Sequence, residues 1–185
     1  MKGLIMGDAA NSRKVGWRLG IMLAGLTMLA GLGWAMTPFS ADHKKEAVQQ
    51  LYASYKKCFP EIPDISPVEA IRLHQEGQAV LVDVRPLAER QVSRLPGAIS
   101  LTEYLHDIGS YQGKTIIAYD TIGYRSGLVV QKQRAKGLPL VNLQGGMLGW
   151  LHAGGKAFDD FGETSRVHVY GALWNYPPPG CETVR

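Results

Sequence analysis

The chain has 185 residues, which is enough for one domain of about 100–150 residues with additional segments. Its hydrophobic content of 45% and charged content of 19% are typical of a folded protein and exclude an intrinsically disordered chain. The formal net charge is +4, and no run of Lys or Arg is longer than two residues, so nucleic-acid binding is not expected.

The first element expected along the chain is a transmembrane helix at residues 19–39, which contain no charged residue. A helix needs about 20 apolar residues to cross the bilayer core, and Trp17 and Trp34 near the ends suit the headgroup region. The alternative is a cleaved signal peptide, whose apolar core is usually only about 7–15 residues long. Because the tail at residues 1–18 is short and basic, we expect a single-pass protein with its main domain on the non-cytoplasmic side, periplasmic if bacterial.

Three further segments follow the expected membrane anchor. Residues 40–64 are expected to form a stalk helix from Lys44 to Lys57 and then a linker, because two closely spaced prolines stop the helix. The folded domain is expected at residues 65–157. Residues 158–185 are expected to be a C-terminal extension whose aromatic side chains pack on that domain.

Within residues 65–157, short apolar runs alternate with helix-prone stretches. Ser66, Pro67 and Glu69 are the residue types that begin a helix, as N-cap, first-turn proline and capping-box partner. The expected strands are 79–82, 99–101, 115–119 and 140–143, and the expected helices are 66–76, 87–92, 102–108, 126–136 and 147–152. This alternation predicts an α/β fold with a central parallel sheet and helices on both faces.

The segment from Thr115 to Gly127 has the pattern of a buried strand, a tight loop and a helix. In a parallel sheet such a loop lies at the carboxyl end of the strand, where ligands bind. Its backbone N–H groups and the helix N-terminus favour an anion or a low-pKa nucleophile. The residue that opens this loop, Asp120, carries a negative charge of its own.

Five motifs in order resemble those of the rhodanese-like domain family. They are Ser66-Pro67-Val68-Glu69, Val82-Asp83-Val84-Arg85, Pro96-Gly97-Ala98-Ile99, the strand, loop and helix at residues 117–126, and Gly145-Gly146 with Gly149-Trp150. The resemblance covers about residues 65–157 and implies the rhodanese-like fold. A further family feature, a basic residue before the Pro-Gly-Ala turn, is matched by Arg94.

In active members of this family, a cysteine opens the loop and accepts sulfane sulfur as a persulfide, and the sixth residue is commonly arginine. That chemistry needs a thiolate. Here the first residue is Asp120 and the sixth is Arg125. A carboxylate cannot hold sulfane sulfur, so the resemblance implies a domain without sulfurtransferase activity. We expect Asp120 to accept hydrogen bonds from its own loop and to pair with Arg125.

The candidate site is therefore the degenerate loop Asp120, Thr121, Ile122, Gly123, Tyr124 and Arg125, in which no catalytic residue is expected. Asp83 and Arg85 are further candidate binding residues, although a structural ion pair is the other interpretation. Thr121, Ile122 and Tyr124 are expected to be exposed and to contact an unidentified protein partner. No cofactor or metal site is expected, because the histidines are scattered.

The sequence favours a membrane-tethered binding or regulatory module and leaves two alternatives open. The first is a sulfurtransferase or thiol-redox enzyme that uses Cys58 or Cys181, which flank the domain and are also candidates for a disulfide in an oxidising compartment. The second is phosphoryl transfer with Asp120 as nucleophile, because the loop resembles that of cysteine-dependent phosphatases.

Overall fold

A computed structural model describes residues 37–185 of the chain, with side chains described from residue 42. No helix within this described part is long and apolar enough to cross a membrane. The membrane span expected at residues 19–39 lies outside the described residues, except for its last positions at 37–39.

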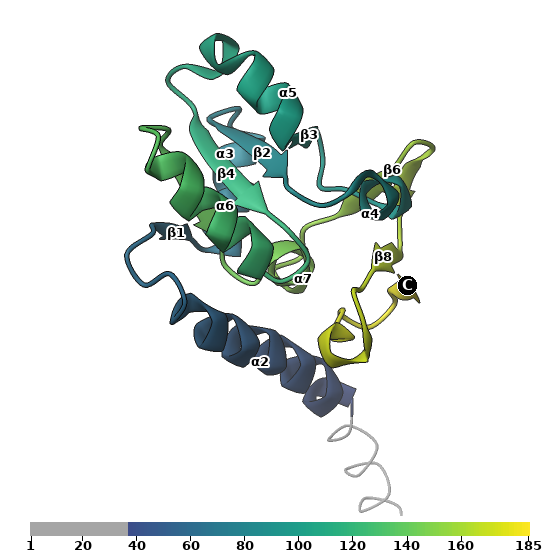
Figure 1. Ribbon diagram of the computed structural model, residues 1–185. Coiled ribbons are helices and arrows are strands. Elements are labelled where there is room, and N and C mark those ends of the chain that lie inside the picture. Colours follow the sequence, from purple (N-terminus) through teal and green to yellow (C-terminus); the bar gives the residue numbers. More distant parts are fainter. Residues whose placement is uncertain (1–36) are drawn as a thin grey trace, which may run out of the picture. The chain divides into compact units, whose positions relative to one another are not determined.

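A five-stranded parallel sheet organises the described residues, with the strand order β1-β5-β4-β2-β3 (Figure 1). The strands are β1 (Asp64–Ile65), β2 (Ala79–Asp83), β3 (Ile99–Ser100), β4 (Thr115–Tyr119) and β5 (Leu140–Leu143). The register of β2 and β4 pairs Asp83 with Tyr119. Parallel pairing therefore brings the loops that follow β2 and β4 to the same edge of the sheet.

Helices cover both faces of the sheet. Successive side chains of the central strands point to opposite sides, so these strands contribute to a core on each face. The helices of the domain are α3 (Pro67–Gln75), α4 (Leu87–Val92), α5 (Leu101–His106), α6 (Tyr124–Arg134) and α7 (Gly146–His152). Leu81 and Ile117 lie in one core with residues of α3 and α7. Val80 and Ile116 lie in a second core with residues of α5 and α6. The α/β class and the parallel sheet expected from the sequence are confirmed.

Most element boundaries agree with the sequence prediction, and the differences have local causes. Ser66 caps α3 as expected, since its Oγ accepts a hydrogen bond from the N–H of Glu69 at 3.2 Å. Helix α5 begins at Leu101, earlier than expected, because Ser100 and Glu103 form a complete capping box. Helix α6 begins at Tyr124 instead of residue 126, so the last two residues of the predicted loop, Tyr124 and Arg125, lie in its first turn.

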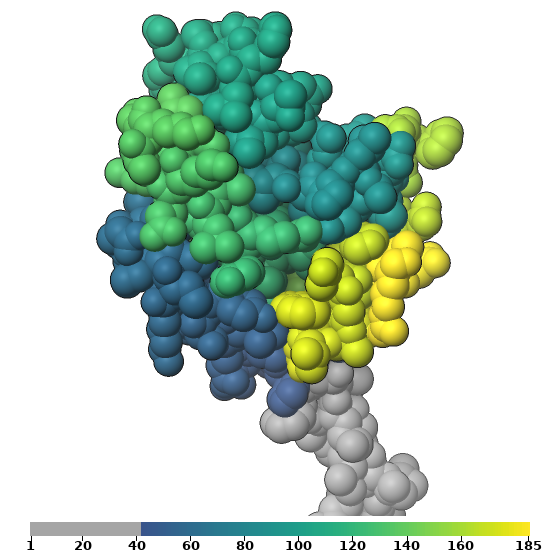
Figure 2. Space-filling view, in the orientation of Figure 1, coloured from purple at the N-terminus to yellow at the C-terminus, as the bar shows by residue number. Residues whose placement is uncertain are grey.

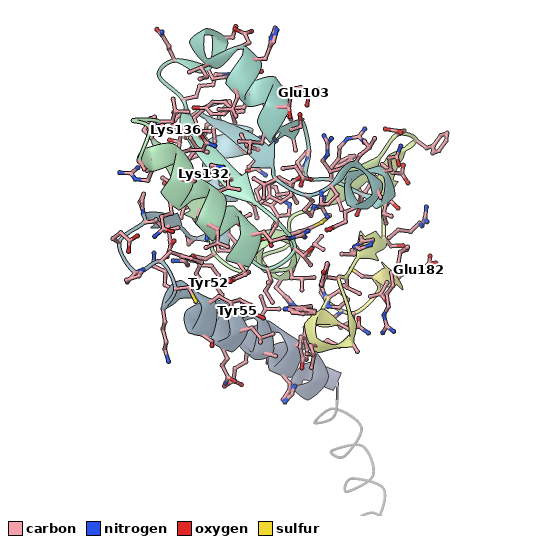
Figure 3. The ribbon with its side chains drawn as sticks, viewed as in Figure 1. Tyr52, Tyr55, Glu103, Lys132, Lys136 and Glu182 are labelled. Carbon is pink, nitrogen blue, oxygen red and sulfur yellow. The ribbon has the colours of Figure 1, made fainter. Side chains whose placement is uncertain are left out.

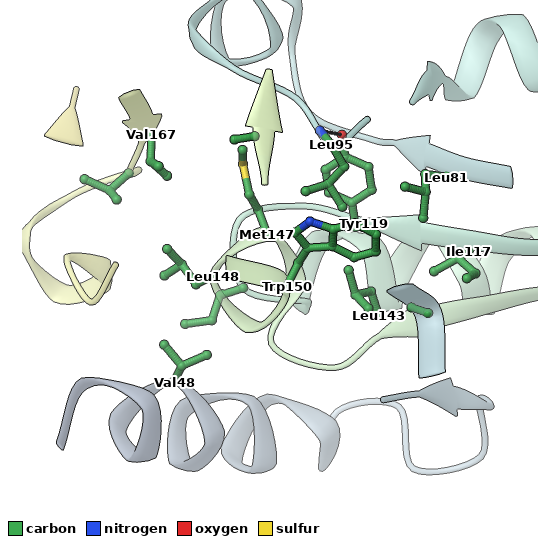
Figure 4. Close-up of a cluster of buried hydrophobic side chains, with 14 of the residues drawn as sticks. Val48, Leu81, Leu95, Ile117, Tyr119, Leu143, Met147, Leu148, Trp150 and Val167 are labelled. Carbon is green, nitrogen blue, oxygen red and sulfur yellow. Dashed lines mark hydrogen bonds between the residues drawn. The ribbon is translucent and has the colours of Figure 1, made fainter. Parts of the chain in front are cut away.

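Helix α2 (Thr37–Lys56) begins earlier than the expected stalk helix and packs on the domain. Val48 is only 2% exposed and belongs to the same core as α7 (Figure 4). Phe59, in the expected linker, is fully buried in the second core. Residues 41–185 form one compact unit, which includes α2 from residue 41 onward.

The C-terminal segment also contributes to this unit. Strand β6 (Ala157–Asp159) pairs with β7 (Gly162–Thr164), and β8 (Arg166–His168) pairs in parallel with β9 (Glu182–Val184). A short 3-10 helix, η2 (Ala172–Trp174), lies between β8 and β9. Val167 and Val169 lie in the core, and the aromatic side chains of Trp174 and Tyr176 pack against it.

Candidate functional site

The carboxylate of Asp120 fills the loop that its own backbone forms. One oxygen, Oδ1, accepts hydrogen bonds from the N–H of Gly123 and from Oγ of Ser126, the latter at 3.0 Å. The other, Oδ2, accepts from the N–H and the Nε of Arg125, at 3.2 and 3.3 Å. Asp120 is only 2% exposed. The donors of the loop are therefore bonded to a buried carboxylate that belongs to the loop itself.

Gly123 allows the chain to turn from the loop into α6. Its φ of 97° is in the left-handed region, and a Cβ at this position would lie 2.6 Å from the ring of Tyr52. The carbonyl of Gly123 accepts a hydrogen bond from Nδ2 of Asn142 at 2.9 Å, and the same Nδ2 donates to the hydroxyl of Tyr52 at 3.1 Å. Buried residues of α2 and β5 therefore support the loop conformation.

The Gly145-Gly146 turn closes against the other side of the loop. The N–H of Met147 donates to the carbonyl of Asp120 at 2.8 Å, and the N–H of Leu148 donates to the carbonyl of Thr121 at 3.1 Å. A Cβ on Gly146 would lie 2.4 Å from the Asp120 carbonyl oxygen, so only glycine allows the two backbones to approach this closely.

Glu89 of α4 is a site residue that the sequence analysis missed. Nη1 and Nη2 of Arg125 donate to its two carboxylate oxygens at 2.6 and 2.8 Å. The Oγ1 of Thr121 and the Nδ1 of His168 lie 3.5 and 3.7 Å from its Oε2. The sequence signal that could have identified Glu89 was its position soon after β2. Parallel pairing puts the segments that follow β2 and β4 at one edge of the sheet.

The environment of Glu89 favours its charged form. Burial by itself raises the pKa of Glu89, but the hydrogen bonds and charge of Arg125, followed by the charges of Arg85 and His168, outweigh that effect. The net result is a pKa below the ordinary value of 4.5. The site therefore holds the ionised carboxylate of Glu89 in a bidentate contact with the guanidinium of Arg125.

Asp83 and Arg85 form a buried network behind this site. Nε and Nη2 of Arg85 donate to the two oxygens of Asp83 at 2.9 and 2.7 Å, and the hydroxyl of Tyr119 donates to Oδ2 at 2.7 Å. Burial and then the charge of Asp83 raise the pKa of Tyr119 well above its ordinary value. Asp83 and Arg85 are 2% and 3% exposed and do not line the cavity described next, so their binding role stays a prediction.

A cavity of about 560 Å³ opens over the Asp120 loop. Its walls come from α2, the loop and start of α6, the residue before α4 and the C-terminal segment, which meet on one face of the molecule (Figure 2). The lining residues are Tyr55, Pro86, Asp120, Thr121, Ile122, Tyr124, Arg125, Tyr170 and Trp174. Two of the predicted binding residues, Tyr124 and Arg125, thus share a cavity with aromatic residues distant in sequence.

Aromatic rings form part of the walls of this cavity. Tyr55, on the side of α2 that faces the domain (Figure 3), lies 5.1 Å from Tyr124 between ring centroids. Its hydroxyl accepts a hydrogen bond from Nε1 of Trp174 at 2.8 Å, which joins α2 to the C-terminal segment. The guanidinium of Arg125 lies 5.7 Å from the ring centroid of Tyr170, within the range of a cation–π contact.

The prediction that Thr121 and Ile122 are exposed was wrong. They are 2% and 3% exposed, because the glycine turn and α7 close against the loop. Both form the floor of the cavity, while Tyr124 is 37% exposed at its edge. Arg94 lies elsewhere and pairs with Asp160 at 2.7 Å.

The two cysteines are free thiols in the structure, and neither lines the cavity. Cys58 is exposed and Cys181 is half-buried, and burial raises the pKa of the Cys181 thiol. No group of three or more His, Cys, Asp or Glu residues that is able to hold a metal ion occurs among residues 37–185.

The model of the rhodanese-like domain family matches residues 66–153. Thiosulfate sulfurtransferase from Pseudomonas aeruginosa is 21% identical, with a TM-score of 0.50, over 62% of this chain and 23% of its own. A protein of unknown function from Rhodopseudomonas palustris, described as a possible tyrosine phosphatase, is 25% identical, with a TM-score of 0.46, over 58% of this chain and 91% of its own. The likeness to the sulfurtransferase is one of fold, since this chain spans only 23% of that protein's length. No curated protein sequence matches this chain.

Proposed function

Because residues 66–153 form a rhodanese-like domain, we propose that this protein is a membrane-tethered binding or regulatory module without sulfurtransferase activity. The observation that carries the proposal is the position of the Asp120 carboxylate among the loop's own donors. Sulfur transfer needs a thiolate nucleophile at this place, and a carboxylate oxygen forms no persulfide. The donors that would stabilise an incoming anion already bind Asp120.

The membrane tether is proposed from the sequence. Residues 19–39 have the length and apolar composition of a single membrane-spanning helix. The short basic segment before them favours a non-cytoplasmic location for the domain, which is the periplasm in a bacterium. A tether of this kind would restrict the search for a partner to the membrane and its surface.

Exposed apolar side chains around the cavity support a binding role. Tyr124, Leu128 and Tyr170 are 37%, 41% and 67% exposed, and Leu87 and Leu173 are 59% and 72% exposed. Tyr124 and Tyr170 line the cavity, and Leu87 and Leu173 are next in sequence to the lining residues Pro86 and Trp174. Exposed apolar side chains beside a cavity are typical of an interaction site. We place the partner's contact on this surface.

The absence of sulfurtransferase activity is tested by measuring thiocyanate formation from thiosulfate and cyanide with the full-length protein. We expect no turnover by the natural protein and measurable turnover by Asp120→Cys, which restores a thiol in the same loop. Turnover by the natural protein would overturn this part of the proposal. Loss of that turnover in Cys58→Ser or Cys181→Ser would then assign the chemistry to one of these thiols.

The binding role is tested by in-membrane cross-linking followed by recovery of the full-length protein. We expect a specific partner that is lost in Tyr124→Ala and kept in Phe161→Ala, because Phe161 is 99% exposed but does not line the cavity. A partner recovered equally with both variants would remove the binding surface from this cavity.

A further inference from the structure

The charged side chains that line the cavity over the Asp120 loop are already partnered. Among the described residues of the lining they are Asp120 and Arg125. Asp120 is buried, and both of its oxygens accept hydrogen bonds from the loop. The Arg125 side chain is 31% exposed, but both terminal nitrogens of its guanidinium donate to Glu89, which is not part of the lining. A charged ligand of either sign would therefore lose its hydration in this cavity without meeting an unpartnered counter-charge.

Four of the lining residues are aromatic, and their rings form two pairs. The ring centroids of Tyr55 and Tyr124 lie 5.1 Å apart, with an interplanar angle of 50°. Those of Tyr170 and Trp174 lie 5.4 Å apart, at 77°. Such tilted and edge-to-face pairs are favourable because the face of a ring carries partial negative charge and its edge partial positive charge. The same preference applies to a further ring that enters the cavity, so an aromatic group is favoured over an aliphatic group of similar size.

These aromatic walls are held in place without a ligand. Nε1 of Trp174 donates to the hydroxyl of Tyr55 at 2.8 Å. The ring centroid of Tyr170 lies 5.7 Å from the guanidinium of Arg125, which is itself fixed by Glu89. Because side chains that are already ordered lose little conformational freedom on association, such walls favour binding. Protein interfaces commonly place an aromatic anchor in a desolvated pocket of this kind.

We propose that this cavity binds an uncharged aromatic side chain, that of a phenylalanine or a tryptophan, from a partner protein. The proposal rests on the binding role proposed above and specifies its ligand. The volume of about 560 Å³ is in the range of about 300–1,000 Å³ that is typical of pockets enclosing organic groups. Exposed Leu87 and Leu173, beside the lining residues Pro86 and Trp174, are available to apolar neighbours of the aromatic residue.

The ligand class is tested with the N-acetyl amino-acid amides of phenylalanine, leucine, lysine and glutamate, which share one backbone. Each is titrated into the full-length protein in a nanodisc of zwitterionic lipid at about pH 7, where the lysine and glutamate side chains are charged. The indole N–H resonance of Trp174, assigned by its loss in Trp174→Phe, reports occupancy. We expect the phenylalanine amide to bind about three- to tenfold more tightly than the leucine amide, and at least about tenfold more tightly than either charged amide.

A matched pair of variants tests whether the aromatic walls cause this preference. Tyr170→Leu removes a ring from the cavity at a position that is 67% exposed, and it should reduce the preference for the phenylalanine amide over the leucine amide about two- to fivefold. Phe161→Leu makes a similar change at a position that is 99% exposed and outside the cavity, and it should leave the preference unchanged. An equal preference in the two variants would overturn the role of the rings.

The outcomes separate the proposed ligand from the proposed binding role. Equal or tighter binding of the leucine amide, tighter binding of either charged amide, or no binding of any probe would overturn the inference. Binding of the phenylalanine amide without any partner that is lost in Tyr124→Ala would assign the cavity to a small aromatic molecule and would overturn the protein ligand. A partner lost in Tyr124→Ala, together with probes that favour leucine, would leave the binding role standing and remove only the aromatic ligand.

Discussion

Arg125 lies closer to Glu89 than to Asp120. Its Nη1 and Nη2 are 2.6 and 2.8 Å from the two carboxylate oxygens of Glu89, whereas its Nε is 3.3 Å from Oδ2 of Asp120. Arg125 therefore joins α4 to the start of α6 across the mouth of the loop. The residue that would clamp a substrate in an open loop acts here as an internal bridge between two carboxylates.

Replacing Glu89 with Gln is expected to lower the free energy of unfolding by about 1–3 kcal/mol, because a charged hydrogen-bond acceptor of Arg125 is lost from a largely buried position. We place the loss below that of a fully buried pair, since the Arg125 side chain is 31% exposed. Chemical denaturation measures the effect. Glu163→Gln, in an exposed pair, should change stability by less than about 0.5 kcal/mol, and equal losses in the two variants would contradict the prediction.

The lowered pKa of Glu89 predicts a dependence of stability on pH. A carboxyl group with a folded-state pKa below its unfolded value stabilises the fold above the unfolded value, and this contribution is lost as the pH falls through the folded value. We expect the Glu89 contribution to be present above about pH 4.5 and to disappear on further acidification. Denaturation across this pH range should show a smaller decline for Glu89→Gln than for the natural protein. Parallel curves would contradict the assignment.

Gly146→Ala is expected to destabilise the protein by at least about 3 kcal/mol, because the new Cβ meets the backbone of the Asp120 loop in addition to the strain of a positive φ. Gly154→Ala is the matched control. Gly154 also has a positive φ, of 87°, but no atom lies within 4 Å of the added Cβ, so a loss of about 1–2 kcal/mol is expected. Thermal unfolding of both variants separates contact from strain, and similar shifts would show that the close approach carries no energy.

Val48→Ala tests whether α2 is part of the folded unit. Val48 is 2% exposed and packs in the main core, so we expect a loss of about 1–3 kcal/mol in the free energy of unfolding. Val68→Ala is the control, because Val68 is 69% exposed and should change stability by less than about 0.5 kcal/mol. No difference between the two variants would mean that α2 contributes nothing to the stability of the core.

Strands β2, β3, β4 and β5 were predictable because local composition determines them, whereas β1 and the short strands β6 to β9 were not predicted. The apolar run at residues 115–119 forms β4 as expected, and the next residue opens the loop. Ser66 and Pro67 begin α3 at the expected position, since capping depends on neighbouring residues only. The identity of Asp120 was enough to predict a loop that binds its own carboxylate and pairs with Arg125.

Contacts between distant segments could not be read in the same way. Glu89 reaches Arg125 because β2 and β4 are parallel neighbours, and their register depends on the packing of the whole sheet. Thr121 was wrongly expected at the surface. Its burial depends on the glycine turn, which is remote in sequence and closes against the loop through backbone contacts. No local pattern in the sequence encodes either of these two contacts.

The sequence by itself determined the parallel α/β domain, the loop after β4 and the aspartate that opens this loop, because apolar periodicity, capping residues and one side-chain identity act locally. Only the tertiary structure decided that α2 and the C-terminal segment bring Tyr55 and Trp174 together over that loop. These two residues are far apart along the chain, and burial of Val48 and Val167 in one core is what holds their segments in place. The aromatic cavity is thus a product of long-range packing around a loop whose charge was already visible in the sequence.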